Sequence, residues 1–188
     1  MRVAALVLAA GASTRLGSLK QLVVLGGETL LERAVRVARE AGCGPVVVVL
    51  GAECAQVLGN SVLGDAVPVV NDEWEEGMAS SIRLGVRTLG VVAKDAEGVL
   101  LMTRDQPAVT AEHLRLLLGQ VEVKASRYAK RNGVPAFFPK RYFDKLMALK
   151  GDAGARELLV AAQYEELVGG ELDVDTVEDL ARARALFG

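Results

Sequence analysis

Residues 3–20 read VAALVLAAGASTRLGSLK, and this stretch decides the fold. Its first part, Val3–Leu8, is apolar without alternation, which is typical of a strand buried on both faces of a parallel sheet. Small residues follow at Ala10, Gly11 and Ala12, so the backbone can turn sharply and approach a ligand closely. Backbone N–H groups that stay unpaired in such a turn form a concavity that binds anions.

Two cations in the same stretch extend this interpretation. Arg15 suits bidentate contact with a phosphate, and Lys20 suits a point contact. The spacing does not fit a Walker A loop, because Gly17 is followed by Ser18, and it lacks the dinucleotide fingerprint G-x-G-x-x-G. The stretch predicts a triphosphate cradle of another type. The alternative is a plain strand–turn–helix corner whose cations are solvated.

Composition limits the class of protein. The chain has 188 residues, a net charge of −2 and no apolar run of the ~18 residues that a membrane span needs. Its start shows no signal peptide, so we expect a cytoplasmic protein with one domain, 1–188, and no membrane contact. The weak net charge argues against nucleic acid as a partner.

Few residues could supply nucleophilic catalysis. Cys43 and Cys54 fit reduced side chains and match neither a disulfide framework nor a zinc site. The single histidine, His113, has Glu112 and Arg115 as neighbours, which predicts a solvated surface position. We therefore expect catalysis that needs no histidine.

Strand-like and helix-like segments alternate along the chain. Strands are expected near 2–9, 45–51, 67–70 and 98–103, and helices near 28–41, 53–59, 77–90, 110–120, 140–149, 153–162 and 176–187. This order predicts a three-layer α/β/α domain with a mainly parallel sheet and ligands outside the carboxyl ends of the strands. Residues 121–128 and 134–138 read as a small antiparallel addition, joined by a turn at 129–133 with Asn-Gly chemistry.

Carboxylates follow two extended segments. Asp105 comes directly after an apolar strand, where a divalent cation that bridges phosphates would find a ligand. Asp173 and Asp175 alternate along a segment before Thr176, so they share one face. The alternatives are that Asp105 only caps the turn or the helix starting near Thr110, and that the second pair belongs to a strand end and a capped helix without ligand.

Another segment, NDEWEEGMASSIR at 71–83, follows the strand at 67–70. Gly77 loosens the entry to a helix whose first-turn hydroxyls, Ser80 and Ser81, can face a nucleobase edge. Taken alone, this segment would be an ordinary capped helix. Lys124, Arg127, Lys130 and Arg131 form a basic edge, for which a solvated face is the favoured interpretation.

Together these motifs resemble nucleotidyltransferases that move a nucleoside monophosphate onto a small phosphorylated acceptor, with molybdenum cofactor cytidylyl- and guanylyltransferases as the nearest relatives. The resemblance runs from Leu8 to Leu180 in the family's order and includes GVPAFF at 133–138 and GDAGAR at 151–156. It implies a Rossmann-like, GT-A-like nucleotidyltransferase fold. Two departures are Arg104, where relatives carry a small residue, and Val134, where they often carry histidine.

The resemblance also implies roles for individual residues. Catalytic roles fall on Arg15, Lys20 and Asp105, and Mg²⁺ ligation on Asp105 and Asp175, with Asp173 behind the latter. The implied nucleotide-binding residues are Leu8, Ala9, Ala10, Gly11, Ala12, Ser13, Arg15, Lys20, Asn71, Gly77, Ser80 and Ser81. The implied acceptor-binding residues are Gly133, Pro135 and Arg156.

On this resemblance, the protein would transfer CMP from CTP to a molybdopterin-type acceptor and release pyrophosphate, and a molybdenum hydroxylase would be a possible partner. A phosphate nucleophile is ionised near neutral pH, so positioning and charge neutralisation suffice. Ala10 favours CTP, because guanine-reading relatives carry Gly-Gly where this chain has Ala10-Gly11. The alternatives are a guanylyltransferase, a sugar-phosphate nucleotidyltransferase and a non-catalytic cofactor carrier.

Overall fold

The apolar strand β1 (Val3–Ala9) lies in the middle of a seven-stranded sheet, and all of its residues are buried. The computed structural model describes residues 1–11 and 19–188. The strands lie in the order β5-β4-β1-β6-β8-β7-β9. Their bounds are Val46–Leu50 (β4), Val67–Val70 (β5), Gly98–Thr103 (β6), Lys124–Tyr128 (β7), Arg131–Pro139 (β8) and Gln163–Glu166 (β9).

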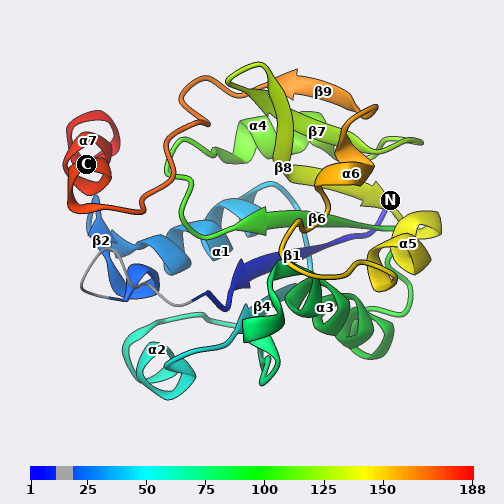
Figure 1. Ribbon diagram of the computed structural model, residues 1–188, viewed down its shortest axis with the longest axis horizontal. Helices are drawn as coiled ribbons and strands as arrows, with labels where there is room; N and C mark the ends of the chain where they lie inside the picture. The colour runs from blue at the N-terminus through cyan, green and yellow to red at the C-terminus, as the bar shows by residue number, and fades with distance from the viewer. Residues whose placement is uncertain (12–18) are drawn as a thin grey trace.

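Helices cover both faces of this sheet (Figure 1). Successive side chains of β1 point to opposite faces, so Ala5 and Val7 belong to one core, and Leu6 and Leu8 to the other. The first core takes in α1 (Leu30–Glu40), α2 (Cys54–Asn60) and α4 (Ala111–Leu117), and the second takes in α3 (Met78–Val92), α5 (Phe143–Met147) and α6 (Arg156–Leu159). The predicted three-layer α/β/α fold is confirmed.

The first helix begins where a capping box fixes its start. The Thr29 hydroxyl accepts from the Glu32 backbone N–H at 3.1 Å, and the Glu32 carboxylate accepts from the Thr29 N–H at 2.9 Å. The last helix, α7 (Val177–Phe187), begins with the same arrangement between Thr176 and Asp179. Thr110 caps α4, so capping that helix does not require Asp105.

The far edge of the sheet contains the predicted antiparallel addition. β8 pairs antiparallel with β6 and β7, whereas β9 pairs parallel with β7. The predicted turn at 129–133 is wrong in detail, because the chain reverses at Ala129 and Lys130, which have φ of 46° and 62°. Asn132 and Gly133 instead lie in β8. The Asn132 amide donates to the carbonyls of Leu159 and Ala162, so its role is to dock α6.

Several short elements were not expected from the sequence. β2 (Val24–Leu25) and β3 (Glu28–Thr29) form a small hairpin, and the 3-10 helices are Lys20–Leu22 (η1), Trp74–Glu76 (η2) and Lys140–Tyr142 (η3). β9 is a largely exposed edge strand of polar residues, and α6 is shorter than the predicted helix 153–162. α7 packs on β2 through a third cluster, beyond the ends toward which β1 and β6 point (Figure 1).

Cys43 is buried and Cys54 half-buried, and both are free thiols, as expected. Burial raises the pKa of the Cys43 thiol to about 12, so this thiol stays protonated. Within residues 1–11 and 19–188, no helix has the length and apolar character that crossing a bilayer requires.

Two glycines of α3 allow a test of packing between helix and sheet. A Cβ on Gly85 would overlap the buried Leu6 side chain of β1, whereas nothing lies within 4 Å of a Cβ on Gly90. We expect Gly85→Ala to lower the free energy of unfolding by about 1–3 kcal/mol through overpacking. Gly90→Ala should raise it by about 0.5–1 kcal/mol, because alanine restricts the unfolded chain. Urea unfolding followed by circular dichroism measures both, and effects of the same sign would contradict this account.

Candidate active site

The turn after β1 opens onto a pocket. Gly11 is exposed, and nothing lies within 4 Å of where its Cβ would be. The adjoining pocket of about 500 Å³, here called the β1 pocket, is lined by Leu8, Ala10, Gly11, Trp74, Glu75, Glu76, Gly77, Met78, Ser81, Thr103, Arg104, Asp105 and Asp152. Ala9 is buried next to it. Ala12, Ser13 and Arg15, three of the predicted site residues, lie outside the described residues.

A buried polar network shapes the segment between β5 and α3. The Asn71 amide donates to the hydroxyls of Ser80 and Ser81, at 2.8 and 2.9 Å, and its side-chain oxygen accepts from the Glu73 N–H. The Ser80 hydroxyl lies 2.9 Å from the carbonyl oxygens of Glu73 and Gly77. Among the predicted residues of this segment, Gly77 and Ser81 therefore line the β1 pocket, whereas Asn71 and Ser80 support it from behind.

Gly77 also brings a distant loop to this pocket. Its φ of +116° is left-handed, and a Cβ there would lie 2.7 Å from the Asp152 Cα. The Ala79 N–H donates to the Gly151 carbonyl at 3.1 Å, which fixes the loop at 151–156 against the start of α3. Only glycine permits this backbone angle and this close approach together. Arg156 is carried by this loop into the second pocket described below.

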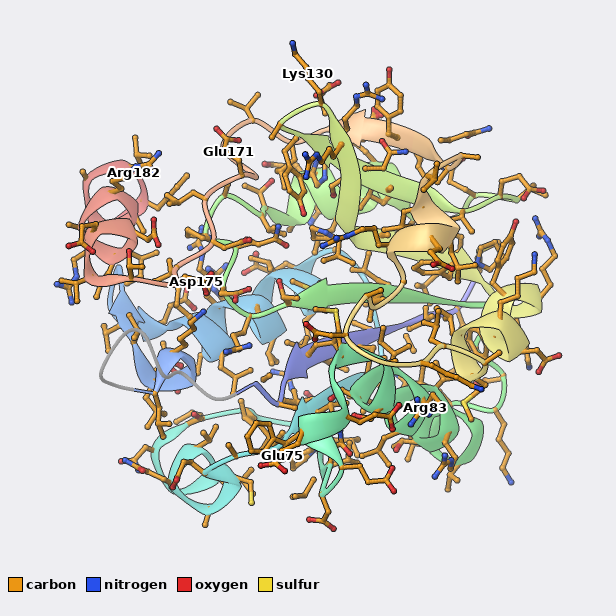
Figure 2. All side chains as sticks on the ribbon, viewed as in Figure 1. Glu75, Arg83, Lys130, Glu171, Asp175 and Arg182 are labelled. Carbon is orange, nitrogen blue, oxygen red and sulfur yellow. The ribbon has the colours of Figure 1, made fainter. Side chains whose placement is uncertain are left out.

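The three charged side chains predicted from distant motifs meet at the carboxyl end of β6. The Val174 N–H donates to the Asp105 carbonyl at 2.9 Å, which holds the segment before α7 beside this strand end. Lys20 Nζ lies 3.8 Å from Asp105 Oδ2 and forms an ion pair with Asp175 Oδ1. Figure 2 shows Asp175 on the segment that leads into α7. Lys20 is 8% exposed, whereas the Asp175 side chain is 34% exposed, so the ammonium is largely shielded from water and one of its two carboxylates is not.

Asp173 differs from these two carboxylates. The residue is exposed overall, but its carboxyl faces the concave wall of the second pocket, where protein replaces part of its hydration shell. This desolvation, and the negative charge of Asp105, raise the pKa of Asp173 to about 7, against the opposing effect of Lys20. Within the described part of the chain, no three His, Cys, Asp or Glu side chains are arranged to hold a metal ion by themselves.

A second pocket, of about 690 Å³, lies beside the first and is here called the hairpin pocket. Its wall includes four basic residues, Arg127, Lys130, Arg131 and Arg156, and the two pockets share Met78, Thr103, Asp105 and Asp152. Figure 2 shows Lys130 at the tip of the β7–β8 hairpin. Of the basic edge expected to be solvated, Lys130 and Arg131 are exposed and Arg127 is half-buried, and all three line this pocket. Lys124 instead donates to the Leu116 carbonyl and pairs with Glu165.

An irregularity in β8 forms part of the hairpin-pocket wall. Ala125 pairs with Ala136 but Ser126 pairs with Gly133, so Val134 and Pro135 bulge out from the ladder. Two hydroxyls of β7 donate to the carbonyls of this bulge, Tyr128 to Val134 at 3.0 Å and Ser126 to Pro135 at 2.7 Å. Of the predicted acceptor residues, Gly133 and Arg156 line the pocket, whereas Pro135 lies behind its wall.

Gln106 ties this wall to the rest of the site, and sequence reasoning gave it no role. Its amide donates to the Tyr128 hydroxyl at 3.2 Å and to the Gly170 carbonyl at 3.3 Å, and its oxygen accepts from Thr103. It is 6% exposed. One side chain next to Asp105 therefore connects β6, the hairpin and the segment that carries Asp173 and Asp175.

His113 corrects another prediction, because it is buried rather than solvated. It lies one helical turn before Leu117, on the face of α4 that packs on the sheet. Its Nε2 lies 2.8 Å from the Ser126 hydroxyl. Since that hydroxyl donates to the Pro135 carbonyl, His113 is the donor in this pair. The residue supports the bulge from within the core and does not line either pocket.

Comparisons with known proteins agree with this geometry. The family described as "MobA-like NTP transferase domain" matches residues 5–167. The chain is 31% identical to purine catabolism protein PucB of Bacillus subtilis, over 94% of this chain and 93% of that protein. It is 32% identical to nicotine blue oxidoreductase of Paenarthrobacter nicotinovorans, over 96% and 95%. A probable molybdenum cofactor guanylyltransferase of Opitutus terrae is 36% identical over 58% of this chain and 50% of its own length.

Solved structures with a similar fold include two of Rv0371c. The crystal structure of Rv0371c from Mycobacterium tuberculosis superimposes with a TM-score of 0.86 at 32% identity, covering 98% of this chain and 97% of that one. Another Rv0371c structure, a complex with manganese, has a TM-score of 0.79 at 29% identity, with 98% and 99% covered.

The buried His113 makes stability depend on pH. Desolvation lowers the pKa of its imidazole below the ordinary value of 6.5; the charge of Glu165 opposes this shift and that of Lys124 adds to it. The fold therefore favours the neutral ring, and this contribution is complete above pH 6.5 and is lost as the pH falls through the lowered pKa. His113→Gln keeps a donor for Ser126 but does not titrate.

We expect the unfolding free energy of the unmodified protein to fall more than that of His113→Gln between about pH 7 and about pH 5. Urea denaturation at several pH values measures the difference, in which the carboxylates common to both proteins cancel. Parallel profiles for the two proteins would contradict a neutral, buried His113.

Proposed function

The chain belongs to the family of MobA-like NTP transferase domains and is a nucleotidyltransferase, and we propose that it transfers CMP from CTP to a molybdopterin-type phosphorylated acceptor and releases pyrophosphate. One observation carries the proposal. Asp105 lies where the β1 pocket, next to the turn at Gly11, meets the hairpin pocket with its basic wall. A nucleotide in the first pocket and an anionic acceptor in the second would meet at this carboxylate.

In this proposal the β1 pocket binds the nucleotide and the hairpin pocket binds the acceptor. Leu8, Ala10, Gly77 and Ser81 would then surround the nucleoside, and the phosphates would lie beside the turn at Gly11. Arg127, Arg131 and Arg156 attract the phosphate of the acceptor and orient it for in-line attack on the α-phosphorus. The acceptor phosphate is already ionised, so no side chain has to remove a proton.

The donor set at Asp105 and Asp175 fits a divalent metal ion. Two carboxylates that reach the same ammonium leave room for phosphate and water oxygens, which Mg²⁺ prefers as its remaining ligands. When bound, the metal would neutralise charge on the phosphates. The similar Rv0371c structure in complex with manganese supports a divalent ion in this fold. Lys20, now between the carboxylates, would turn toward the α-phosphate, and Arg15 would brace the triphosphate.

Ala10 supports CTP as the donor. Its methyl group lies in the wall of the β1 pocket and is almost fully buried, so it has little room to move away from a larger base. Contact between this methyl group and a purine would disfavour GTP relative to CTP by about 1–3 kcal/mol. A molybdenum hydroxylase remains the proposed recipient of the product, in a cytoplasmic setting; similarity to a protein named as an oxidoreductase is consistent with such a recipient.

The reaction has a direct test. Pyrophosphate release from CTP, GTP, ATP and UTP is measured with Mg²⁺ and molybdopterin, with sugar phosphates as competing acceptors. We expect CTP with molybdopterin to be preferred, and Asp105→Asn to lower kcat by at least about 100-fold, because metal and phosphates lose a charge partner. Equal or faster turnover of GTP would contradict the assignment of the base. Activity that survives in Asp105→Asn would contradict the mechanism.

Lys20 yields a prediction that does not depend on turnover. Its ammonium and a divalent ion use the same two carboxylates, so they compete in the absence of nucleotide. We expect Lys20→Met to bind Mn²⁺ about 10-fold more tightly than the unmodified protein without nucleotide, because a competing charge is removed. Electron paramagnetic resonance of free Mn²⁺ measures this, with the exposed Lys94→Met as the control. Unchanged or weaker Mn²⁺ binding would place the metal elsewhere.

A further inference from the structure

Arg104 is a buried cation in the wall of the β1 pocket. The residue follows β6 directly and is only 9% exposed, although its side chain lines a pocket together with Leu8 and Ala10. Its Nε is buried without a hydrogen-bond partner. Among residues 1–11 and 19–188, no side chain or carbonyl forms a hydrogen bond or ion pair with this guanidinium.

Such a group is costly in a folded protein. A guanidinium stays protonated at any physiological pH, so burial cannot neutralise it. A buried charge without a partner destabilises the fold, and native structures normally pair it. Arg33 shows the usual outcome, because its Nε is also unpaired but its terminal nitrogens reach the Pro107 carbonyl and Glu28.

Carboxylates in the same pocket do not pair with Arg104. Glu76 forms two hydrogen bonds with Arg83 across the start of α3, which lower the pKa of its carboxyl. Asp105 faces Lys20. Glu75 and Asp152 are exposed at the rim, where water solvates them. Arg104 is therefore the buried positive charge of this pocket whose partner the described residues do not supply.

We propose that Arg104 binds the phosphate chain of the nucleotide in the β1 pocket. The proposal rests on the proposed function only for the identity of the ligand as a nucleoside triphosphate. An Nε–H and a terminal N–H of guanidinium present a fork that matches two phosphate oxygens. The turn at Gly11, whose backbone would face the same phosphates, opens onto the same pocket.

The phosphate chain is favoured over the base because the missing partner of a buried full charge is an anion. Base edges offer only neutral acceptors, which would leave the charge without compensation. A small residue at this position would supply no charge and would carry no desolvation cost. Arg104 thus lowers the stability of the ligand-free protein and raises its affinity for an anion.

Binding of inorganic pyrophosphate, CTP and GTP is measured by isothermal titration calorimetry with Mg²⁺. The proteins are the unmodified chain, Arg104→Gln, Arg104→Lys and the exposed Arg87→Gln, which makes the same charge change on the outer face of α3. We expect Arg104→Gln to weaken all three ligands about 10- to 100-fold, the effect of losing a charged hydrogen bond. Arg104→Lys should recover part of this loss, and Arg87→Gln should match the unmodified protein.

A second measurement separates binding from a structural role. Because Arg104→Gln removes an uncompensated buried charge, we expect it to raise the melting temperature of the ligand-free protein and to reduce the further rise on adding pyrophosphate. A lower melting temperature without ligand, or unchanged binding of all three ligands, would overturn the proposal. Loss of binding for one nucleotide with pyrophosphate unaffected would also overturn it, since Arg104 would then read the base.

The two proposals fail in different ways. If the unmodified protein binds pyrophosphate through Arg104 but transfers no nucleotide, the proposed function is wrong and the anion site stands. If it transfers CMP while Arg104→Gln binds every ligand normally, the reaction stands and Arg104 has no part in it.

Discussion

A single backbone hydrogen bond organises the site. The Val174 N–H donates to the Asp105 carbonyl and returns the segment after β9 to the carboxyl end of β6. It helps to place Asp175 near Asp105, although the two residues lie at distant points of the chain. The hydrogen bond from Gln106 to the Gly170 carbonyl and the apolar cluster around Val174 hold the same segment. Lys20, from the other side, then draws both carboxylates together. This return of the chain brings the charged side chains of the site close together. Charges interact strongly only when they are close and partly shielded from water.

The layers and much of the site could be predicted from the sequence. Strands buried on both faces, such as Val46–Leu50, require helices on both sides of the sheet, and this predicts the three layers. The strand β6 begins and ends at the predicted residues. Short edge elements could not be predicted, since β9 is polar and is defined by its pairing with β7. The predicted surface position of His113 is wrong, because its polar neighbours Glu112 and Arg115 do not reflect its place on the buried face of α4 with Leu114 and Leu117. A helix of seven residues has only a short apolar stripe, so its sequence defines the covered face weakly.

Contacts with other elements also determine the structural role of the Asn132-Gly133 pair. Such a pair usually makes a hairpin turn, but here Ala129 and Lys130 take the left-handed angles. Gly133 is needed for a different reason, because a Cβ there would overlap the Tyr128 hydroxyl. That hydroxyl must come close, since it satisfies the Val134 carbonyl that the bulge removes from the ladder. At the bulge, the structure beside the hairpin pocket is thus held by backbone carbonyls whose hydrogen-bond partners are side chains.

The family match ends at residue 167, but the last helix lies beyond it. Val174 and Ala183 join α7 to the β2 strand in a small apolar cluster of their own, and Asp175 lies between them in the chain. A fragment trimmed to the matched range would retain most of β1 and the other strands of the large sheet and would still lack Asp175, an acidic partner of Lys20. The matched range therefore ends before one of the charged side chains that meet at the end of β6, because Asp175 belongs to the 21 residues that follow the match.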